Sequence, residues 1–360
     1  MTQRSDPRRI GERDREVLRD VVLTYIVSAE PVSSRTIARH GQLSLSSASI
    51  RNTMADLEEA GLLYQPHTSA GRVPTAAGYH LFIDSLMESR SLTPKERRHI
   101  DDVLARTPPE TKQLLEAVVF LLKDLSHQVS IVLAPAMAET VLRSIELVPV
   151  ADRQVLCVMV SAAGVVDNKI IELDEPLTRE ELTRISNYLT ESFGGQTLDA
   201  IRERLLGMMA EERARLDRML AISLELARRG LAGREERQVL VEGTSELLAQ
   251  PELADIGRVR QVFETFSRRA QLVSMLNQLL GREGVRVLIG SDSELTSPLD
   301  FSLVATTYGI GSHPLGGIAI FGPSRMEYPR LIPLVRYLGD ALSRILAARH
   351  AGSAEENRER

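Results

Sequence analysis

The stretch 31–84 reads PVSSRTIARHGQLSLSSASIRNTMADLEEAGLLYQPHTSAGRVPTAAGYHLFID, and it carries the strongest structural signal in the chain. Within it, Ile50, Met54 and Leu57 recur at helical spacing behind serines that can cap a helix, which predicts a helix over 47–60. Helical patterns also precede it over 13–28 and 34–40. The following LLYQPHTSAGRVPT has the turn residues of a short β-hairpin. Three helices and a hairpin predict a winged helix-turn-helix.

The outer face of the predicted third helix is unusually small and polar. Ala48, Asn52 and Ala55 point away from the apolar stripe, and Ser49 and Arg51 flank them. Small side chains permit close approach to a major groove, where asparagine can pair with adenine and arginine with guanine or phosphate. A serine-capped helix with a polar outer face is also common in proteins that bind no nucleic acid. The pattern alone therefore leaves both interpretations open.

Composition excludes several classes of protein. The 360 residues favour two or three domains, and the single cysteine, Cys157, excludes a disulfide framework or a multi-cysteine metal site. The net charge of −5 predicts no global attraction to nucleic acid, so DNA binding must depend on a local patch. No apolar run is long enough for a membrane span, and the first twenty residues lack the apolar core of a secretory signal. We therefore expect a cytoplasmic protein that is not attached to a membrane.

The remaining chain reads as an interrupted α/β domain. Strand patterns occupy 144–173 and return over 285–322, and a long helical pattern at 198–227 lies between them. A helix-start signal at Thr93 and a Pro108-Pro109 stop resemble a connector. The expected units are a winged-helix domain with its following helix at 1–92, a linker at 93–110, a discontinuous domain at 111–197 and 284–350, an insertion at 198–283 and a disordered tail at 351–360.

Long stretches of this sequence resemble a known family. SASIRNTMADLEEAGLL, QPHTSAGRVPT and GYHLFID are similar to the N-terminal signature of the HrcA heat-inducible transcription repressors, and VRVLIGSDSEL, FSLVATTYG and GGIAIFGPSRMEY are similar to that family's closing segments. Two small departures are His80, where a second basic residue is expected, and Ala29-Glu30, where a Thr-Gly pair is usual.

The resemblance implies both a fold and a function. The implied fold is α+β and multidomain: an N-terminal winged helix-turn-helix, a GAF-like α/β domain and an inserted, mainly helical dimerisation domain. The implied protein is a homodimer that binds an inverted-repeat operator in double-stranded DNA upstream of chaperone genes and is kept active by the GroEL chaperonin. It needs no cofactor. The resemblance assigns DNA contacts to eight residues: Ser47, Ser49, Arg51 and Asn52 in the helix, and His67, Thr68, Ser69 and Arg72 in the wing.

Catalytic and metal-binding patterns are weak. The sequence contains no phosphate-binding loop and no HExxH motif, and Cys157 lies in the apolar run VLCVMV, where we expect a buried structural thiol. His127 and His313 lack neighbouring ligands, the acids in 290–295 suit a solvated loop, and Arg325 suits a structural role at a strand-to-helix junction. We therefore expect no enzyme and no metal site. The alternative to a repressor is a GAF-type small-molecule sensor whose DNA binding depends on a metabolite.

Overall fold

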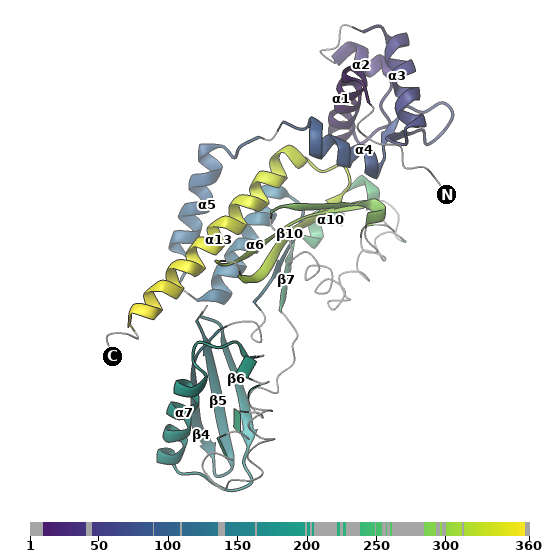
Figure 1. The fold of residues 1–360 in the computed structure, drawn as a ribbon. Helices are drawn as coiled ribbons and strands as arrows, with labels where there is room; N and C mark the ends of the chain where they lie inside the picture. Colours follow the sequence, from purple (N-terminus) through teal and green to yellow (C-terminus); the bar gives the residue numbers. More distant parts are fainter. Residues whose placement is uncertain are drawn as a thin grey trace.

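The protein has an α+β architecture in which an N-terminal helical unit precedes two separate sheets (Figure 1). The computed structural model describes residues 10–40, 45–88, 90–108, 110–135, 141–162, 164–198, 200–201, 204, 222–223, 226–227, 238–248, 250–253, 257, 260, 284–292, 296, 300–311 and 313–356. Most of the predicted long helix over 198–227 and most of the predicted insertion lie outside these residues. None of the described helices is long and apolar enough to cross a bilayer.

The N-terminal unit contains the predicted three helices and hairpin. Helices α1 (Glu12–Ser28), α2 (Ser34–His40) and α3 (Ser47–Glu59) are followed by the antiparallel pair β1 (Leu63–Tyr64) and β2 (Val73–Pro74). The apolar stripe predicted for α3 is buried, and the Ser46 hydroxyl caps this helix by accepting a hydrogen bond from Ser49 N at 3.1 Å. The capping serine and the apolar period therefore set where α3 begins and which face it exposes.

Two glycines allow backbone segments to approach closely around the hairpin. A Cβ on Gly71 would overlap the carbonyl of Val32, which exchanges two backbone hydrogen bonds with Arg72 at 2.8 and 2.9 Å. A Cβ on Gly78 would overlap the carbonyl oxygen of Leu62, which already accepts from Thr75 N at 3.0 Å. The base of the hairpin is thus held by the segment around Val32 on one side and by the start of α4 (Ala76–Leu81) on the other.

The expected linker is an ordered helix. After α4 (Ala76–Leu81) and the π-helix η2 (Phe82–Leu86), the chain forms α5 (Pro94–Arg106) and α6 (Thr111–Ser126). Thr93 and Glu96 form a capping box at the start of α5. Glu96 accepts from Arg330 at 3.2 Å, and Asp101 accepts from the Tyr337 hydroxyl at 2.9 Å. A segment that looked like a charged connector therefore packs on the C-terminal helix through its polar side chains.

The larger sheet has five antiparallel strands in the order β7-β3-β10-β9-β8. Helices α6 and α13 (Tyr328–Glu356) cover one face, where alternate strand residues such as Val132, Val304 and Ile318 are fully buried (Figure 1). The strands are β3 (Val129–Leu133), β7 (Val239–Glu242), β8 (Arg286–Ile289), β9 (Phe301–Ile310) and β10 (His313–Pro323). Short helices α10 (Thr244–Leu248), η5 (Pro251–Leu253) and η6 (Gly290–Asp292) lie at its edges.

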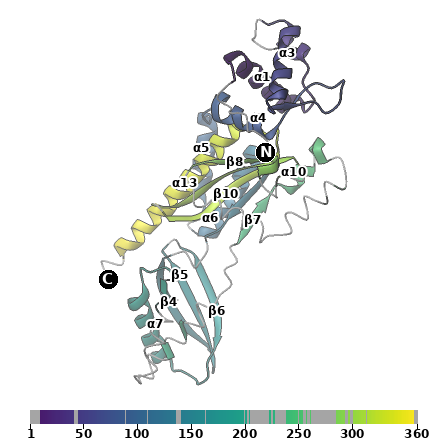
Figure 2. The same cartoon turned by 45° about the vertical axis from the view of Figure 1, so that its right-hand side comes forward.

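The smaller sheet is separate and has the order β4-β5-β6 (Figure 2). Its antiparallel strands β4 (Leu142–Ala151), β5 (Gln154–Ser161) and β6 (Val166–Glu172) pack one face on α7 (Arg179–Phe193). This differs from the expected domain at 111–197, because β4 to β6 do not join the five-stranded sheet, whereas β7, expected within the insertion at 198–283, pairs with β3. Alternating apolar residues identify a strand but not the sheet that it joins.

The C-terminal helix extends further than the sequence predicts. Its apolar period predicts a last helix over about 329–348, with a regular start near Leu331 because Pro333 lacks the N–H that an internal helical residue donates. In the structure α13 begins at Tyr328. The carbonyl left without its usual donor belongs to Pro329, and it accepts from Arg90 N at 3.2 Å. Residues 351–356, expected in the tail, continue α13.

Replacing Gly78 with alanine should destabilise the N-terminal unit. An alanine in a helix ordinarily gains about 1 kcal/mol over glycine, but here its methyl group would displace the backbone at Leu62, so we expect a loss of about 1–3 kcal/mol. Denaturant unfolding measures this change. The control is Ala77→Ser on the exposed side of α4, which should change stability by less than about 0.5 kcal/mol. A Gly78→Ala variant as stable as the parent would contradict the close approach.

Candidate nucleic-acid interface

Helix α3 presents its two readout candidates to solvent. Arg51 and Asn52 are both exposed, and Ala48 and Ala55 lie exposed beside them. The opposite face holds the core residues Ile50, Thr53, Met54 and Leu57, all buried. Because the core fixes the rotation of α3, the arginine fork and the carboxamide point outward beside the exposed Ala48 and Ala55. That surface has the shape and donor set that a major groove accepts.

The two predicted serines contribute to the start of α3. The Ser47 hydroxyl lies 3.3 Å from the Ser34 hydroxyl of α2. Ser49 donates its backbone N–H to Ser46, and its carbonyl accepts from Arg13 Nη2 at 3.2 Å. Both serines are half-buried. These contacts tie the first turn of α3 to α1 and α2, so the serines position the helix whether or not they also touch DNA.

The wing tip exposes three of the predicted residues on a braced loop. His67, Thr68 and Ser69 are exposed. Gln65 Nε2 donates to the carbonyls of Thr68 at 3.1 Å and Ala70 at 2.8 Å, closing the loop from inside. A single internal carboxamide therefore holds the tip in shape, and the three side chains face solvent as a donor-rich edge.

Arg72 differs from the other predicted contacts because its charge is already paired. Its Nη2 lies 2.8 Å from Glu58 Oε2, and the arginine side chain is only 18% exposed. The ion pair joins the base of the wing to the C-terminal half of α3. The family resemblance assigns Arg72 to DNA, and the sequence spacing of Arg72 and Glu58 does not predict that they pair. In the structure its guanidinium fixes the angle between wing and helix.

Exposed arginines outside α3 were not singled out from the sequence. Arg13 in α1 and Arg35 and Arg39 in α2 are exposed on the same N-terminal unit. The four-residue spacing of Arg35 and Arg39 on a short helix could have signalled a shared face. The position of Arg13 beside α3 depends on tertiary packing and leaves no mark in the sequence.

The other candidate chemical groups have structural partners. Cys157 is buried in β5, and this burial raises the pKa of its thiol to about 11. Asp292 accepts from Ile289 N at 2.8 Å and contacts His80 Nε2 at 2.5 Å, so it links η6 to α4. Arg325 binds Glu252 and donates to Gln250 at 3.1 Å. Over the described part of the chain, no three histidine, cysteine or carboxylate side chains gather as metal ligands.

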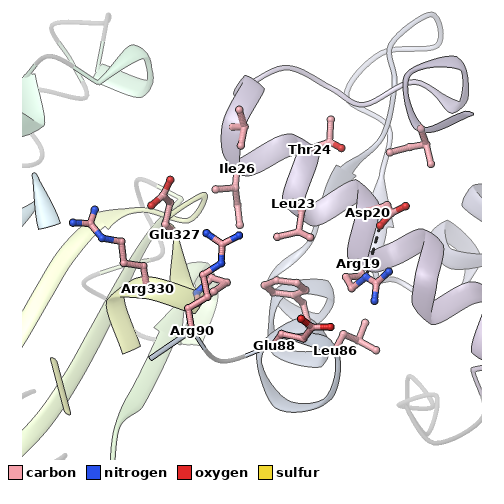
Figure 3. A pocket seen from close by; sticks show the side chains of 14 residues that line it. Arg19, Asp20, Leu23, Thr24, Ile26, Leu86, Glu88, Arg90, Glu327 and Arg330 are labelled. Atoms are coloured by element: carbon pink, nitrogen blue, oxygen red, sulfur yellow. Dashed lines mark ion pairs between the residues drawn. The ribbon is translucent and has the colours of Figure 1, made fainter. Parts of the chain in front are cut away.

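A cavity of about 610 Å³ lies where the N-terminal unit meets the start of α13 (Figure 3). Apolar groups from α1 and η2 face charged groups around Arg90, Glu327 and Arg330 across it. The cavity is at the junction of the two units and not inside the five-stranded sheet. Its lining residues are Arg19, Asp20, Leu23, Thr24, Ile26, Val27, Ile37, Phe82, Leu86, Glu88, Arg90, Glu327, Pro329 and Arg330.

The matching family model and the similar curated proteins agree on one family. The model of the HrcA protein C-terminal domain matches residues 112–332. The heat-inducible transcription repressor HrcA of Geobacter sulfurreducens is 40% identical over 337 residues, which cover 94% of this chain and 98% of that protein. The HrcA of Syntrophobacter fumaroxidans is 34% identical over 339 residues, covering 94% and 97%. A crystal structure described as that of a hypothetical protein is similar in fold, with a TM-score of 0.59, 24% identity and coverage of 96% of this chain and 100% of that one.

Truncating the exposed pair on α3 tests its role in readout. If Arg51 and Asn52 contact bases, Arg51→Ala and Asn52→Ala should each weaken binding to an inverted-repeat duplex by about 1–3 kcal/mol. Both side chains are exposed, so folding should be unchanged, which thermal unfolding checks. The matched control is Arg336→Ala, which removes an exposed arginine on α13 and should leave the affinity unchanged. Unchanged affinity in both truncated variants would refute the assignment.

Proposed function

The chain belongs to the HrcA family of heat-inducible transcription repressors, and we propose that it represses chaperone genes by binding an inverted-repeat operator as a homodimer. As a member of this family it is a transcription repressor and not an enzyme. The observation that carries the proposal is the exposed Arg51 and Asn52 pair on α3, flanked by alanines and held by a buried opposite face. The wing residues His67, Thr68 and Ser69 would contact the adjacent backbone or groove.

We assign the five-stranded sheet with α6 and α13 to the GAF-like domain and the chain between β3 and β7 to the inserted dimerisation domain. The support is that β7 pairs directly with β3, although about a hundred residues separate them in the sequence. The three-stranded sheet and α7 lie within this stretch and form their own buried cluster. On this assignment the insertion contains a sheet as well as helices.

The outer face of the three-stranded sheet is our candidate for the dimer contact. Its inner face packs on α7, whereas Val148, Val150, Val166 and Ile170 are 41–58% exposed on the strands. The register aligns Val148 with Leu156 and Leu156 with Ile170, so apolar side chains form a row across all three strands. An inverted-repeat operator demands a two-fold protein, and a two-fold interface brings the same patch of both copies together.

Charging this face should produce monomers. Val166→Lys and Ile170→Lys together would place two unpaired ammonium groups in the interface, which is costly unless they are solvated. Light scattering should then give the 39.9 kDa mass of one chain in place of twice that mass. The control is Val27→Lys, because Val27 is 83% exposed on α1 in the N-terminal unit. Persistence of the dimer in the double variant would exclude this face.

The family resemblance also supplies the proposed regulation. We propose that the GroEL chaperonin keeps the repressor in its DNA-competent fold, and that repression lapses when unfolded proteins occupy the chaperonin. A repressor of marginal stability has two populations, and a chaperone that returns the inactive one to the native fold shifts the active fraction.

Fluorescence anisotropy on purified protein tests the proposed function. We expect an inverted-repeat duplex to be preferred over a scrambled duplex of equal length by a factor of about 10³ or more. Chaperonin with ATP should raise the active fraction. The arm without chaperonin and ATP contains no added small molecule, so specific binding in that arm would also argue against the alternative of a metabolite-dependent sensor. Equal and steeply salt-dependent binding to both duplexes would mean phosphate contacts only and would overturn operator recognition.

A further inference from the structure

Arg13 is an exposed arginine whose position is set by the candidate readout helix itself. It lies in the first turn of α1, and its Nη2 donates to the carbonyl of Ser49 in the first turn of α3 at 3.2 Å. A guanidinium carries five N–H donors in a planar fork, so this bond leaves donors free on an exposed group. The side chain is therefore oriented before any ligand arrives and moves with α3.

Two further arginines, Arg35 and Arg39, lie in α2, whose beginning contacts the first turn of α3. The hydroxyls of Ser34 and Ser47 lie 3.3 Å apart and join the beginning of α2 to the beginning of α3. Arg35 follows Ser34, and Arg39 lies one helical turn further along, about 6 Å away along the axis. Both are exposed, and neither forms an ion pair with another described residue. Their charges are available to an external anion.

The acidic residues of α3 lie at its other end. Asp56, Glu58 and Glu59 occupy its C-terminal half, and Glu58 is paired with Arg72. Glu12 and Asp14 flank Arg13 along α1 and reduce the local positive potential. With a net charge of −5 for the chain, attraction to DNA must come from individual well-placed arginines and not from the overall field.

We propose that Arg13, Arg35 and Arg39 bind backbone phosphates bordering the groove that α3 enters, and so hold the N-terminal unit on the duplex without reading its sequence. The inference rests on the proposed operator binding and adds a phosphate-binding role for two helices outside the readout surface. Phosphate contacts orient a protein on the duplex and carry no sequence information directly. Arg13 has a specific advantage, because an arginine already held by the Ser49 carbonyl loses less freedom when it meets a phosphate.

The experiment compares Arg13→Gln, Arg35→Gln and Arg39→Gln with the parent on an inverted-repeat and a scrambled duplex across a salt series. Each variant should reduce the slope of log affinity against log salt by about one. Affinity should fall about tenfold for both duplexes alike at low salt, so the preference between them is retained. Arg336→Gln, an exposed position on α13, is the matched control and should change neither quantity.

A conservative variant separates charge from geometry. Arg13→Lys keeps the charge, but an ammonium lacks the planar fork that can bond the Ser49 carbonyl and a phosphate together. We expect it to keep the parent's salt slope and to recover only part of the affinity lost in Arg13→Gln. Full recovery would overturn the claim that orientation by Ser49 matters.

The outcomes distinguish this inference from the proposed function. If the parent protein does not prefer the inverted repeat, the proposed function is overturned, whatever the variants show. A parent that does prefer it, with variants of unchanged slope and affinity, overturns the phosphate role. Variants that lose the preference between duplexes overturn it too, since they would be reading bases. Arg35 and Arg39 are exposed and form no ion pair with another residue that the structure describes, so their variants decide the matter even if Arg13→Gln loosens α1.

Discussion

The contact between Tyr79 and Tyr328 is the constraint on which the arrangement of the molecule depends. Their rings meet edge to face with centroids 5.8 Å apart, and both side chains are almost wholly buried. One apolar cluster runs through this contact from α1 to Leu346 in α13. Burial raises the pKa of both phenols, so they stay protonated, and Tyr328 donates to the carbonyl of Ser324 at 2.7 Å. The N-terminal unit therefore packs on the unit that contains the five-stranded sheet through a continuous core, with His80 and Asp292 at its edge.

Much of the local structure could be predicted from the sequence. Helix caps and the spacing of apolar residues predict the bounds of α2 and α3 and the outward direction of Arg51 and Asn52. The turn residues after α3 predict the hairpin. Features that depend on distant partners could not be predicted. Pro333 sits inside α13 because Arg90, 243 positions earlier, donates to the Pro329 carbonyl. The same limit explains why β7 was assigned to the insertion and why the pairing of Arg72 with Glu58 was missed.

In the candidate interface, α3 and the wing have different roles. Side chains on the outer face of α3 have the chemistry for reading bases, whereas the wing is braced by Gln65 and fixed to α3 by an ion pair. The polar groups around the first turn of α3 are used within the unit, between Ser34 and Ser47 and between Arg13 and Ser49. An acidic chain can bind an anionic polymer in this way because the binding surface is small and rigid and its favourable charges are local.

The position of β3 in the larger sheet has a consequence for how the chain acquires its fold. Leu133 pairs with Gly317, which is synthesised 184 residues later, and β3 lies between β7 and β10 in the sheet order. During synthesis on the ribosome, β3 therefore stays unpaired with β10, and its apolar side chains stay exposed, until nearly the entire polypeptide has emerged. Sheets closed by such distant pairings form slowly and expose aggregation-prone surface meanwhile. For a chain with this topology, the interval between the synthesis of β3 and its pairing with β10 is the period in which the sheet is open to aggregation.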